Sequence, residues 1–244
     1  MELNVNWCLA SKAITLESGI NGESGLSTKN SIQAVTFDMD GTMFNTEDIY
    51  DFVSEMVLQR RNRHFDQELK LKMMGLPGDQ AFQIMIDHCG LKDSVQTLAA
   101  ETHELFTEVL PSQIEKMPGL ARLLKFLSER EIPCAVATSS SRQLADLSIS
   151  TCGMTECFQF VLTSEDVDQG KPHPEIYLKA ANRFGIETSQ MLVFEDSPIG
   201  SRAAVDSGAL TVAVPCSHTE HCNFDHVPHR ANTLEDELIY GLLG

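Results

Sequence analysis

The chain has 244 residues, 42% of them hydrophobic, which is enough for one large domain or for a core domain with a smaller insertion. Its formal net charge of −17 argues against nucleic acid or an anionic membrane surface as a partner, because no basic tract supplies the contacts that such surfaces need. An anionic substrate therefore requires local positive charge, from a metal ion or from a few lysine and arginine residues.

Cysteine usage and hydropathy indicate the compartment. Seven cysteines are scattered and odd in number, which favours reduced thiols over a disulfide framework: Cys8, Cys89, Cys134, Cys152, Cys157, Cys216 and Cys222. The N-terminus has no positively charged region with a continuous apolar stretch, and no later segment approaches the roughly 18 apolar residues of a membrane helix. We therefore expect a cytoplasmic protein without a membrane partner, as a monomer or a weak homo-oligomer.

Residues 1–30 differ in composition from the rest of the chain. A short alternating apolar piece from Leu3 to Leu9 is followed by a stretch rich in glycine, serine and asparagine through Asn30. This composition favours a disordered or loosely attached N-terminal extension. An edge strand or an oligomer contact is the alternative interpretation.

The first expected strand is the apolar run Ala34–Phe37, which leads directly into Asp38-Met39-Asp40-Gly41-Thr42. Apolar residues then recur at helical spacing, and Gly90 and Pro111 are expected to end two of the helices. The predicted helices cover residues 47–63, 79–89 and 94–110. No strand-like run interrupts them, so we expect residues 44–117 to form a helical cap inserted after the first strand.

Beyond Pro118 and Gly119, short apolar runs alternate with helical segments. The expected strands are residues 134–137, 160–162, 191–194 and 210–214. The expected helices are residues 120–129, 142–151, 174–184, 199–206 and 234–243, the last of which would also suit an edge strand. Such alternation predicts an α/β fold in which helices cover both faces of a doubly wound parallel sheet. The core would comprise residues 31–43 and 118–244.

Acidic, hydroxyl and amino side chains follow the predicted strands, at the edge where parallel sheets bind ligands. Asp38 and Asp40 leave an extended strand on the same side, so they repel each other unless a cation lies between them or one takes up a proton. Hard oxygen ligands of this kind are what Mg²⁺ takes, and Asp38 and Asp196 are the candidates. The full set of expected site residues is Asp38, Asp40, Thr138, Ser139, Lys171, Glu195 and Asp196.

Together these elements resemble the haloacid dehalogenase superfamily, in the branch with a helical cap that includes β-phosphoglucomutase and sugar-phosphate phosphatases. The matching motifs are F-D-M-D-G-T at 37–42, A-V-A-T-S at 135–139, G-K-P-H-P at 170–174 and F-E-D-S-P-I-G-S-R-A-A at 194–204. Their order and spacing cover residues 31–214. The resemblance implies a Rossmann-like core, Mg²⁺ as cofactor and phosphoryl transfer as the chemistry.

The resemblance also implies roles for the two aspartates of the first motif. Asp38 would attack phosphorus and form an aspartyl-phosphate, which splits one difficult displacement into two easier steps. Asp40 would protonate the leaving alcohol and then act as a base toward water, while its main-chain carbonyl faces the metal. Dehalogenases lack this second acid, because a halide leaving group needs no proton, so Asp40 points to phosphoryl transfer.

Residues of the later motifs would bind the phosphoryl group and the metal. Thr138, the Ser139 amide and Lys171 would hold the phosphoryl oxygens, and Lys171 with Mg²⁺ would offset the charge of an anionic nucleophile. Glu195 and Asp196 would complete the metal site, with Asp196 as the closer ligand.

The predicted cap departs from the mutase pattern. In the mutases of this group an arginine of the cap grips a second phosphate, and Gly78 takes its place in the stretch Met74–Asp79, while the family's histidine aligns with Tyr50. Losing a bidentate clamp removes what retains a bisphosphate intermediate, so we expect hydrolysis of a small phosphorylated metabolite, a sugar or polyol monophosphate. A β-phosphoglucomutase-like isomerase stays an alternative if Lys70 or Lys72 replaces the clamp, and a non-catalytic binding protein of the same fold is another.

A cluster of soft ligands near the C-terminus is the remaining candidate site. Its spacing does not repeat a zinc-finger pair, so an ordinary loop is the favoured interpretation. His64 and His88 in the cap are equally compatible with surface groups and with substrate contacts. The cluster comprises Cys216, His218, His221 and Cys222, with His226 and His229 beyond.

Overall fold

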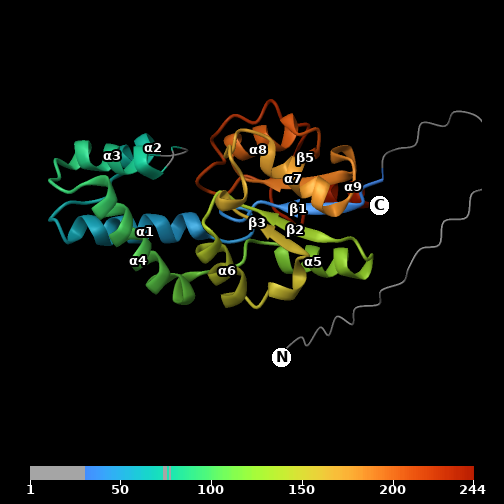
Figure 1. Ribbon diagram of the computed structural model, residues 1–244, viewed down its shortest axis with the longest axis horizontal. Helices are drawn as coiled ribbons and strands as arrows, with labels where there is room; N and C mark the ends of the chain where they lie inside the picture. Colours follow the sequence, from blue (N-terminus) through green and yellow to red (C-terminus); the bar gives the residue numbers. More distant parts are fainter. Residues whose placement is uncertain (1–30, 74–75, 77) are drawn as a thin grey trace, which may run out of the picture.

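A parallel sheet of six strands lies at the centre of the molecule (Figure 1). The computed structural model describes residues 31–73, 76 and 78–244. The strand order is β3-β2-β1-β4-β5-β6, and each neighbouring pair is parallel. This arrangement confirms the predicted α/β class. The strands are β1 Ala34–Phe37, β2 Cys134–Ala137, β3 Phe160–Leu162, β4 Met191–Glu195, β5 Leu210–Ala213 and β6 His229–Arg230.

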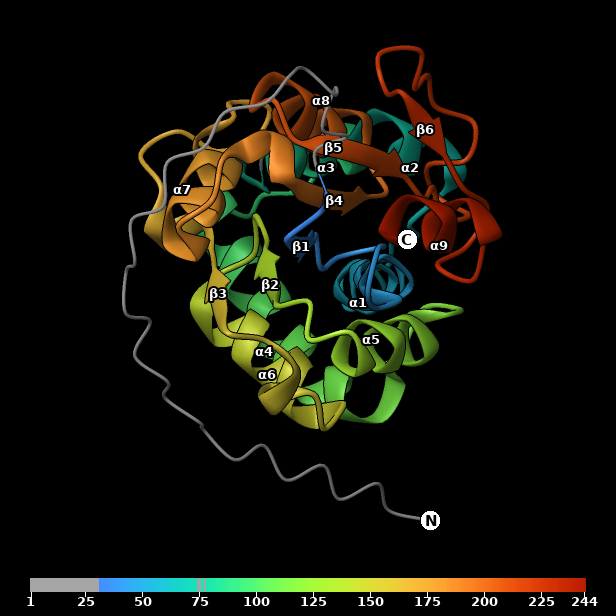
Figure 2. The same cartoon turned by 90° about the vertical axis from the view of Figure 1, so that its right-hand side faces the viewer.

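Helices cover both faces of the sheet (Figure 2), so the side chains of its central strands are buried on both sides. Side chains alternate along each strand, so Phe37 and Phe194 belong to one hydrophobic cluster while Met191 and Val193 belong to another. Helices α5 (Leu120–Glu129), α6 (Arg142–Thr151) and α9 (Glu237–Leu243) contribute to the first cluster. Helices α7 (Glu175–Phe184) and α8 (Pro198–Asp206) contribute to the second.

A helical insertion lies between β1 and α5 and extends away from one end of the sheet (Figure 1). Its helices are α1 Thr46–Gln59, α2 Gln67–Met73, α3 Gly78–Cys89 and α4 Val95–Gln113. Their apolar faces form a hydrophobic cluster separate from those of the sheet, with Val53, Leu98 and Phe106 fully or almost fully buried. Tyr50 of α1 stacks on Phe106 of α4, with ring centroids 4.2 Å apart. The helical insertion therefore has a core of its own.

The helical insertion is joined to the sheet by the two segments that enter and leave it, which pair with each other, and by its packing against helix α6. Phe44 forms an antiparallel bridge with Lys116, and the Asn45 side chain accepts a hydrogen bond from the Glu115 N–H at 2.7 Å. Leu144 of α6 packs into the hydrophobic cluster of the insertion. The insertion is thus attached at its linkers and along α6.

Most expected elements appear within a few residues of their predicted ends, but α4 does not end before Pro111. It continues to Gln113 with the proline inside its last turn. A proline removes one N–H donor from a helix, and the Ile114 N–H still reaches the Leu110 carbonyl at 2.9 Å. The sequence expectation that Pro111 stops this helix was wrong because the loss of a single bond near a helix end is tolerated.

Other differences concern short elements and the described range. The short helix α2 and the two-residue strand β6 were not expected. The last apolar segment is a helix rather than an edge strand, and the Asp236 side chain caps it by accepting a hydrogen bond from the Leu238 N–H. The predicted extension 1–30 lies outside the described residues, as do Met74, Gly75 and Pro77. Short 3-10 helices lie at Thr155–Cys157, Ser164–Asp166 and Thr188–Gln190.

Candidate active site

The carboxyl ends of the three central strands bring polar side chains together. Asp38 directly follows β1, Thr138 follows β2, and Glu195 ends β4. The strand ladders continue for one residue past the strands, since the Asp38 N–H donates to the Phe194 carbonyl at 2.9 Å and the Thr138 N–H donates to the Leu162 carbonyl at 3.0 Å. These side chains therefore start from fixed positions at one edge of the sheet.

Lys171 reaches this edge from the loop between β3 and α7. Its ammonium donates to Asp38 Oδ1 at 2.6 Å, to Glu195 Oε1 at 2.7 Å and to the Ala137 carbonyl at 2.9 Å. The Lys171 side chain is only 6% exposed. Burial acts to lower the pKa of Lys171, but the charges of Asp38 and Glu195 outweigh it and raise the pKa well above its usual value. The lysine is therefore a permanent cation beside Asp38.

Asp40 lies next to Asp38 and is held by two hydroxyl groups. Its Oδ2 accepts hydrogen bonds from Thr138 Oγ1 at 2.9 Å and from Ser140 Oγ at 2.8 Å. The Ser140 N–H in turn donates to Thr138 Oγ1 at 2.9 Å. One carboxylate oxygen of Asp40 is thus fixed, which orients the other.

Asp38, Glu195 and Asp196 form a buried acidic cluster whose ligand atoms all lie within 4.8 Å of one another. Burial raises the pKa of Asp38 well above its usual value, the charge of Glu195 adds to this, and Lys171 opposes it. The pKa of Asp196 is likewise raised by burial and by Asp38 and Glu195. Lys171 is the only cation that hydrogen-bonds to this cluster among the described residues, so the cluster carries more acid than base. Such a donor set fits a hard divalent cation.

The two neighbouring acids on β4 are held in different ways. Glu195 Oε1 accepts hydrogen bonds from Lys171 and, at 2.7 Å, from the Tyr177 hydroxyl, and Oε2 accepts from the Ser197 hydroxyl at 3.2 Å. Both oxygens of Glu195 are therefore engaged by the protein. Gly200 is required beside them, because a Cβ at this position would lie 1.9 Å from Glu195 Oε1.

Asp196 is held on one side only. Its Oδ2 lies 3.3 Å from the Cys216 thiol and 3.4 Å from the Thr219 hydroxyl. Gly41 approaches so closely that a Cβ there would lie 2.3 Å from the same oxygen. These contacts leave Asp196 Oδ1 better placed than either oxygen of Glu195 to accept an additional ligand.

The first turn of α1 faces this edge from the helical insertion. Burial raises the pKa of Glu47 to about 7, and the charge of Asp40 contributes to the rise. Burial and the charges of Asp40 and Glu47 also raise the pKa of Tyr50. Lys70 of α2 forms an ion pair with Asp51 of α1. The insertion thus presents a polar wall to the acidic motif.

The structure also locates the remaining sequence candidates. Ser139 is exposed and follows Thr138 directly, whereas its neighbour Ser140, which was not expected, contacts Asp40. Lys72 pairs with Glu68 at 2.7 Å on the surface of α2. Tyr177 was also missed, because nothing in the sequence indicates that its hydroxyl points to Glu195.

The histidine and cysteine candidates do not gather into a second metal site. Among the described residues, the acidic cluster at Asp38 is the only group of three or more potential ligands close enough to share an ion. His64 lies 2.9 Å from Glu55, and His88 lies 3.5 Å from Asp66, so each contacts a carboxylate of the insertion. The interpretation of the C-terminal histidine and cysteine residues as an ordinary loop is therefore favoured.

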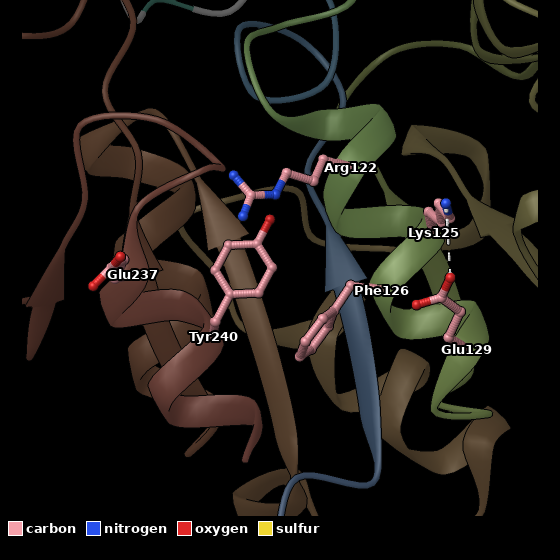
Figure 3. Close-up of a pocket in the computed structure, with 6 residues that line it drawn as sticks. All are labelled: Arg122, Lys125, Phe126, Glu129, Glu237 and Tyr240. Atoms are coloured by element: carbon pink, nitrogen blue, oxygen red, sulfur yellow. Dashed lines mark ion pairs between the residues drawn. The ribbon is translucent and has the colours of Figure 1, made fainter.

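A separate hollow of about 560 Å³ lies between α5 and α9 (Figure 3). Its apolar part is formed by Phe126 and Tyr240, whose rings meet edge to face with centroids 4.8 Å apart. Arg122 lies over the Tyr240 ring at 5.3 Å. The lining residues are Arg122, Lys125, Phe126, Glu129, Glu237 and Tyr240. They include none of the residues around Asp38, so this hollow is distinct from the candidate active site.

Known proteins are similar to this chain in sequence and in fold. A family model described as "Haloacid dehalogenase-like hydrolase" matches residues 35–214. The (DL)-glycerol-3-phosphatase 2 of Arabidopsis thaliana is 38% identical over 197 residues, covering 77% of this chain and 81% of that protein. The (DL)-glycerol-3-phosphatase 1, mitochondrial, of the same plant is 35% identical over 207 residues, covering 80% and 68%. A crystal structure from Thermotoga maritima named "putative beta-phosphoglucomutase" has a TM-score of 0.74 at 26% identity, covering 86% of this chain and 98% of that one.

The chain therefore belongs to the haloacid dehalogenase-like hydrolase family. Within the family it has the helical insertion, and it is related to β-phosphoglucomutase and to sugar-phosphate phosphatases. The predicted enzyme class, a phosphoric monoester hydrolase of this family, is confirmed by these relatives. No helix in the described part of the chain combines the length and the apolar character needed to cross a bilayer.

Proposed function

We propose that this chain is a Mg²⁺-dependent phosphatase that hydrolyses a sugar or polyol monophosphate through an aspartyl-phosphate on Asp38. The observation that carries the proposal is the contact of Lys171 with both Asp38 and Glu195, beside an Asp40 held by Thr138 and Ser140. A nucleophile, an adjacent cation and an oriented acid are the parts that this reaction needs.

Asp38 attacks phosphorus with the oxygen that Lys171 does not hold. Lys171 binds Oδ1, which leaves Oδ2 for the new bond, and the alcohol oxygen of the substrate leaves with the electron pair of the broken P–O bond. Attack by a carboxylate on a phosphate dianion is opposed by like charges. The ammonium of Lys171 reduces this repulsion at both reactants.

Asp40 supplies the proton that the leaving alcohol needs. The two hydroxyl donors on Oδ2 orient Oδ1 toward the leaving group, and the same carboxylate then removes a proton from the water that attacks the aspartyl-phosphate. The Thr138 hydroxyl donates a hydrogen bond to Asp40, and in this proposal Thr138 also helps to hold the oxygens of the transferred phosphoryl group. The Ser139 amide is the further donor to that group.

The acidic cluster of Asp38, Glu195 and Asp196 would hold Mg²⁺, and the Asp40 main-chain carbonyl would face it. When bound, the ion supplies positive charge that neutralises the phosphoryl oxygens and the carboxylates together. The surplus of buried acid in the cluster supports this assignment. Glu195 would complete this site and also position Lys171, because its oxygens accept hydrogen bonds from Lys171, Tyr177 and Ser197.

The polar wall of the helical insertion supports a hydroxylated substrate. Glu47 and Tyr50 offer an acceptor and a donor that suit a polyol or sugar, and both Arabidopsis relatives are named (DL)-glycerol-3-phosphatase. We infer that residues 44–117 act as a cap, which excludes bulk water when it covers the substrate. The cytoplasmic location stays a prediction, since the name of one relative specifies mitochondria.

A panel of phosphorylated metabolites with Mg²⁺, scored by kcat/KM, tests the proposal. We expect glycerol 3-phosphate or a sugar monophosphate to exceed the rest of the panel clearly. Uniformly feeble turnover would count against this substrate class. Removal of Mg²⁺ with EDTA should abolish turnover, and restoring the ion should recover it.

A β-phosphoglucomutase-like isomerase is the alternative that the name of the Thermotoga structure favours. Lys70 and Lys72 are the cap cations considered as replacements for the missing arginine clamp. Both are paired with carboxylates, which supports hydrolysis instead. The two reactions differ in their products. A large excess of isomerised sugar phosphate over released phosphate, with a bisphosphate activator present, would overturn the hydrolase proposal.

A further inference from the structure

The turn that follows β5 contacts two parts of the candidate active site at once. Cys216 and Thr219 both lie against Asp196 Oδ2, and the Cys216 N–H donates to the Thr219 hydroxyl at 3.1 Å. These contacts anchor the turn 216–219 at the edge of the sheet. His218, which lies between the two anchors, is therefore held at a defined place.

His218 reaches from this turn to the helical insertion. Its Nε2 lies 2.7 Å from Asp48 Oδ1, and its Nδ1 lies 3.9 Å from Asp51 Oδ2. The His218 side chain is only 10% exposed. Both ring nitrogens thus face carboxylates of α1.

The same first turns of α1 carry the polar wall that faces Asp40. Glu47 precedes Asp48, and Tyr50 precedes Asp51. A shift of α1 would therefore move Glu47 and Tyr50 relative to Asp40. The insertion is also attached by its packing against Leu144 of α6, and the His218 contact adds a polar attachment at the first turns of α1.

We propose that His218 is a positioning residue that holds the first turns of α1 against the catalytic edge through Asp48 and Asp51. The inference rests on the proposed function for its effect on turnover, but its structural part does not. His218 touches no reacting atom. It sets where Glu47 and Tyr50 lie when a substrate alcohol occupies the cleft, so its loss should weaken the use of a substrate that those residues recognise.

The first test needs no activity. Hydrogen exchange is measured for peptides from Thr46–Gln59 in the wild-type chain, in His218→Ala, in Asp48→Ala and in the double variant. We expect exchange in the first turns of α1 to be roughly threefold faster or more in each single variant than in the wild-type chain. The double variant should exchange no faster than either single variant. His221→Ala is the matched control, because His221 is an exposed residue three positions further on.

The second test separates positioning from general damage. With glycerol 3-phosphate, His218→Ala and Asp48→Ala should each lower kcat/KM roughly tenfold, the effect of losing one hydrogen bond to a charged group, mainly through KM. With p-nitrophenyl phosphate, whose leaving group needs little protonation, the change in kcat/KM should stay within about twofold. The Asp48→Ala variant leaves the turn 216–219 intact, so it reports on the contact even if His218→Ala disturbs folding.

Three results would overturn the inference: unchanged exchange in α1, additive effects in the double variant, or equal losses on both substrates. A wild-type chain that hydrolyses neither probe would instead contradict the proposed function. In that case the exchange measurement still decides whether His218 holds α1.

Discussion

Glu47 provides a prediction whose size follows from the structure. The carboxyl lies in the first turn of α1 with the charge of Asp40 nearby, and its pKa rises from an ordinary value of 4.5 to about 7. An acid whose folded-state pKa is raised holds its proton more tightly when folded, so folding loses stability as the pH climbs from the unfolded pKa to the folded one. The penalty is complete above about pH 7.

Replacing Glu47 with glutamine removes this penalty because the amide has a similar shape and never ionises. An interval of about 2.5 pH units corresponds to about 3 kcal/mol at most, at 1.36 kcal/mol per unit. The Glu47→Gln variant should therefore gain stability relative to wild type by about 2 kcal/mol or more between about pH 5 and about pH 8. The gain appears at the higher pH, where wild-type Glu47 would have to ionise in its half-buried position near Asp40.

Urea unfolding in EDTA at the two pH values measures this difference without interference from divalent cations. Glu108→Gln is the control, since Glu108 is an exposed carboxylate on α4 and should show the same stability difference from wild type at both pH values. If the difference in the free energy of unfolding between Glu47→Gln and wild type is the same at both pH values within about 0.5 kcal/mol, the reasoning is refuted. It would mean that the Glu47 carboxyl is not held away from water by the insertion.

Three further variants test the candidate active site. Lys171→Met should lower kcat by roughly 10²–10³-fold while the chain stays folded by circular dichroism, because it removes the cation that contacts Asp38; retention of even a tenth of the activity would contradict that role. Asp40→Asn should reduce kcat/KM for glycerol 3-phosphate by about 10²–10⁴-fold and for p-nitrophenyl phosphate much less, so equal losses would argue against Asp40 as the acid. Gly200→Ala should lower stability by about 1–3 kcal/mol, because its Cβ meets Glu195, whereas Gly241→Ala, with open space around it, should not.

Elements with strong local patterns were predictable from the sequence. Strand β2 and helix α5 have the expected bounds, because a short apolar run before a turn and a regular apolar stripe are clear local signals. Helix α2 has only seven residues and buries only Leu69, so it lacks such a stripe. Strand β6 consists of two residues that pair with β5, and that pairing is a tertiary contact without a local signature.

The part of the candidate site that directly follows the strands was predictable from the sequence. Asp38 and Thr138 follow neighbouring strands, and parallel pairing alone brings them to one edge. The contacts of Ser140 with Asp40 and of Tyr177 with Glu195 depend on side-chain direction and helix packing, which spacing does not specify. The position of His218 against α1 depends on how the insertion lies on the sheet, so it had no signal in the sequence beyond the histidine itself.

The central claim is that Asp38 carries the phosphoryl group during turnover. The most direct measurement quenches the wild-type chain in acid while it turns over glycerol 3-phosphate with Mg²⁺, and then locates the phosphoryl adduct by peptide mass spectrometry. We predict an adduct on Asp38, with neither adduct nor turnover in Asp38→Asn. An adduct on a different residue, or wild-type turnover by Asp38→Asn, would contradict the account.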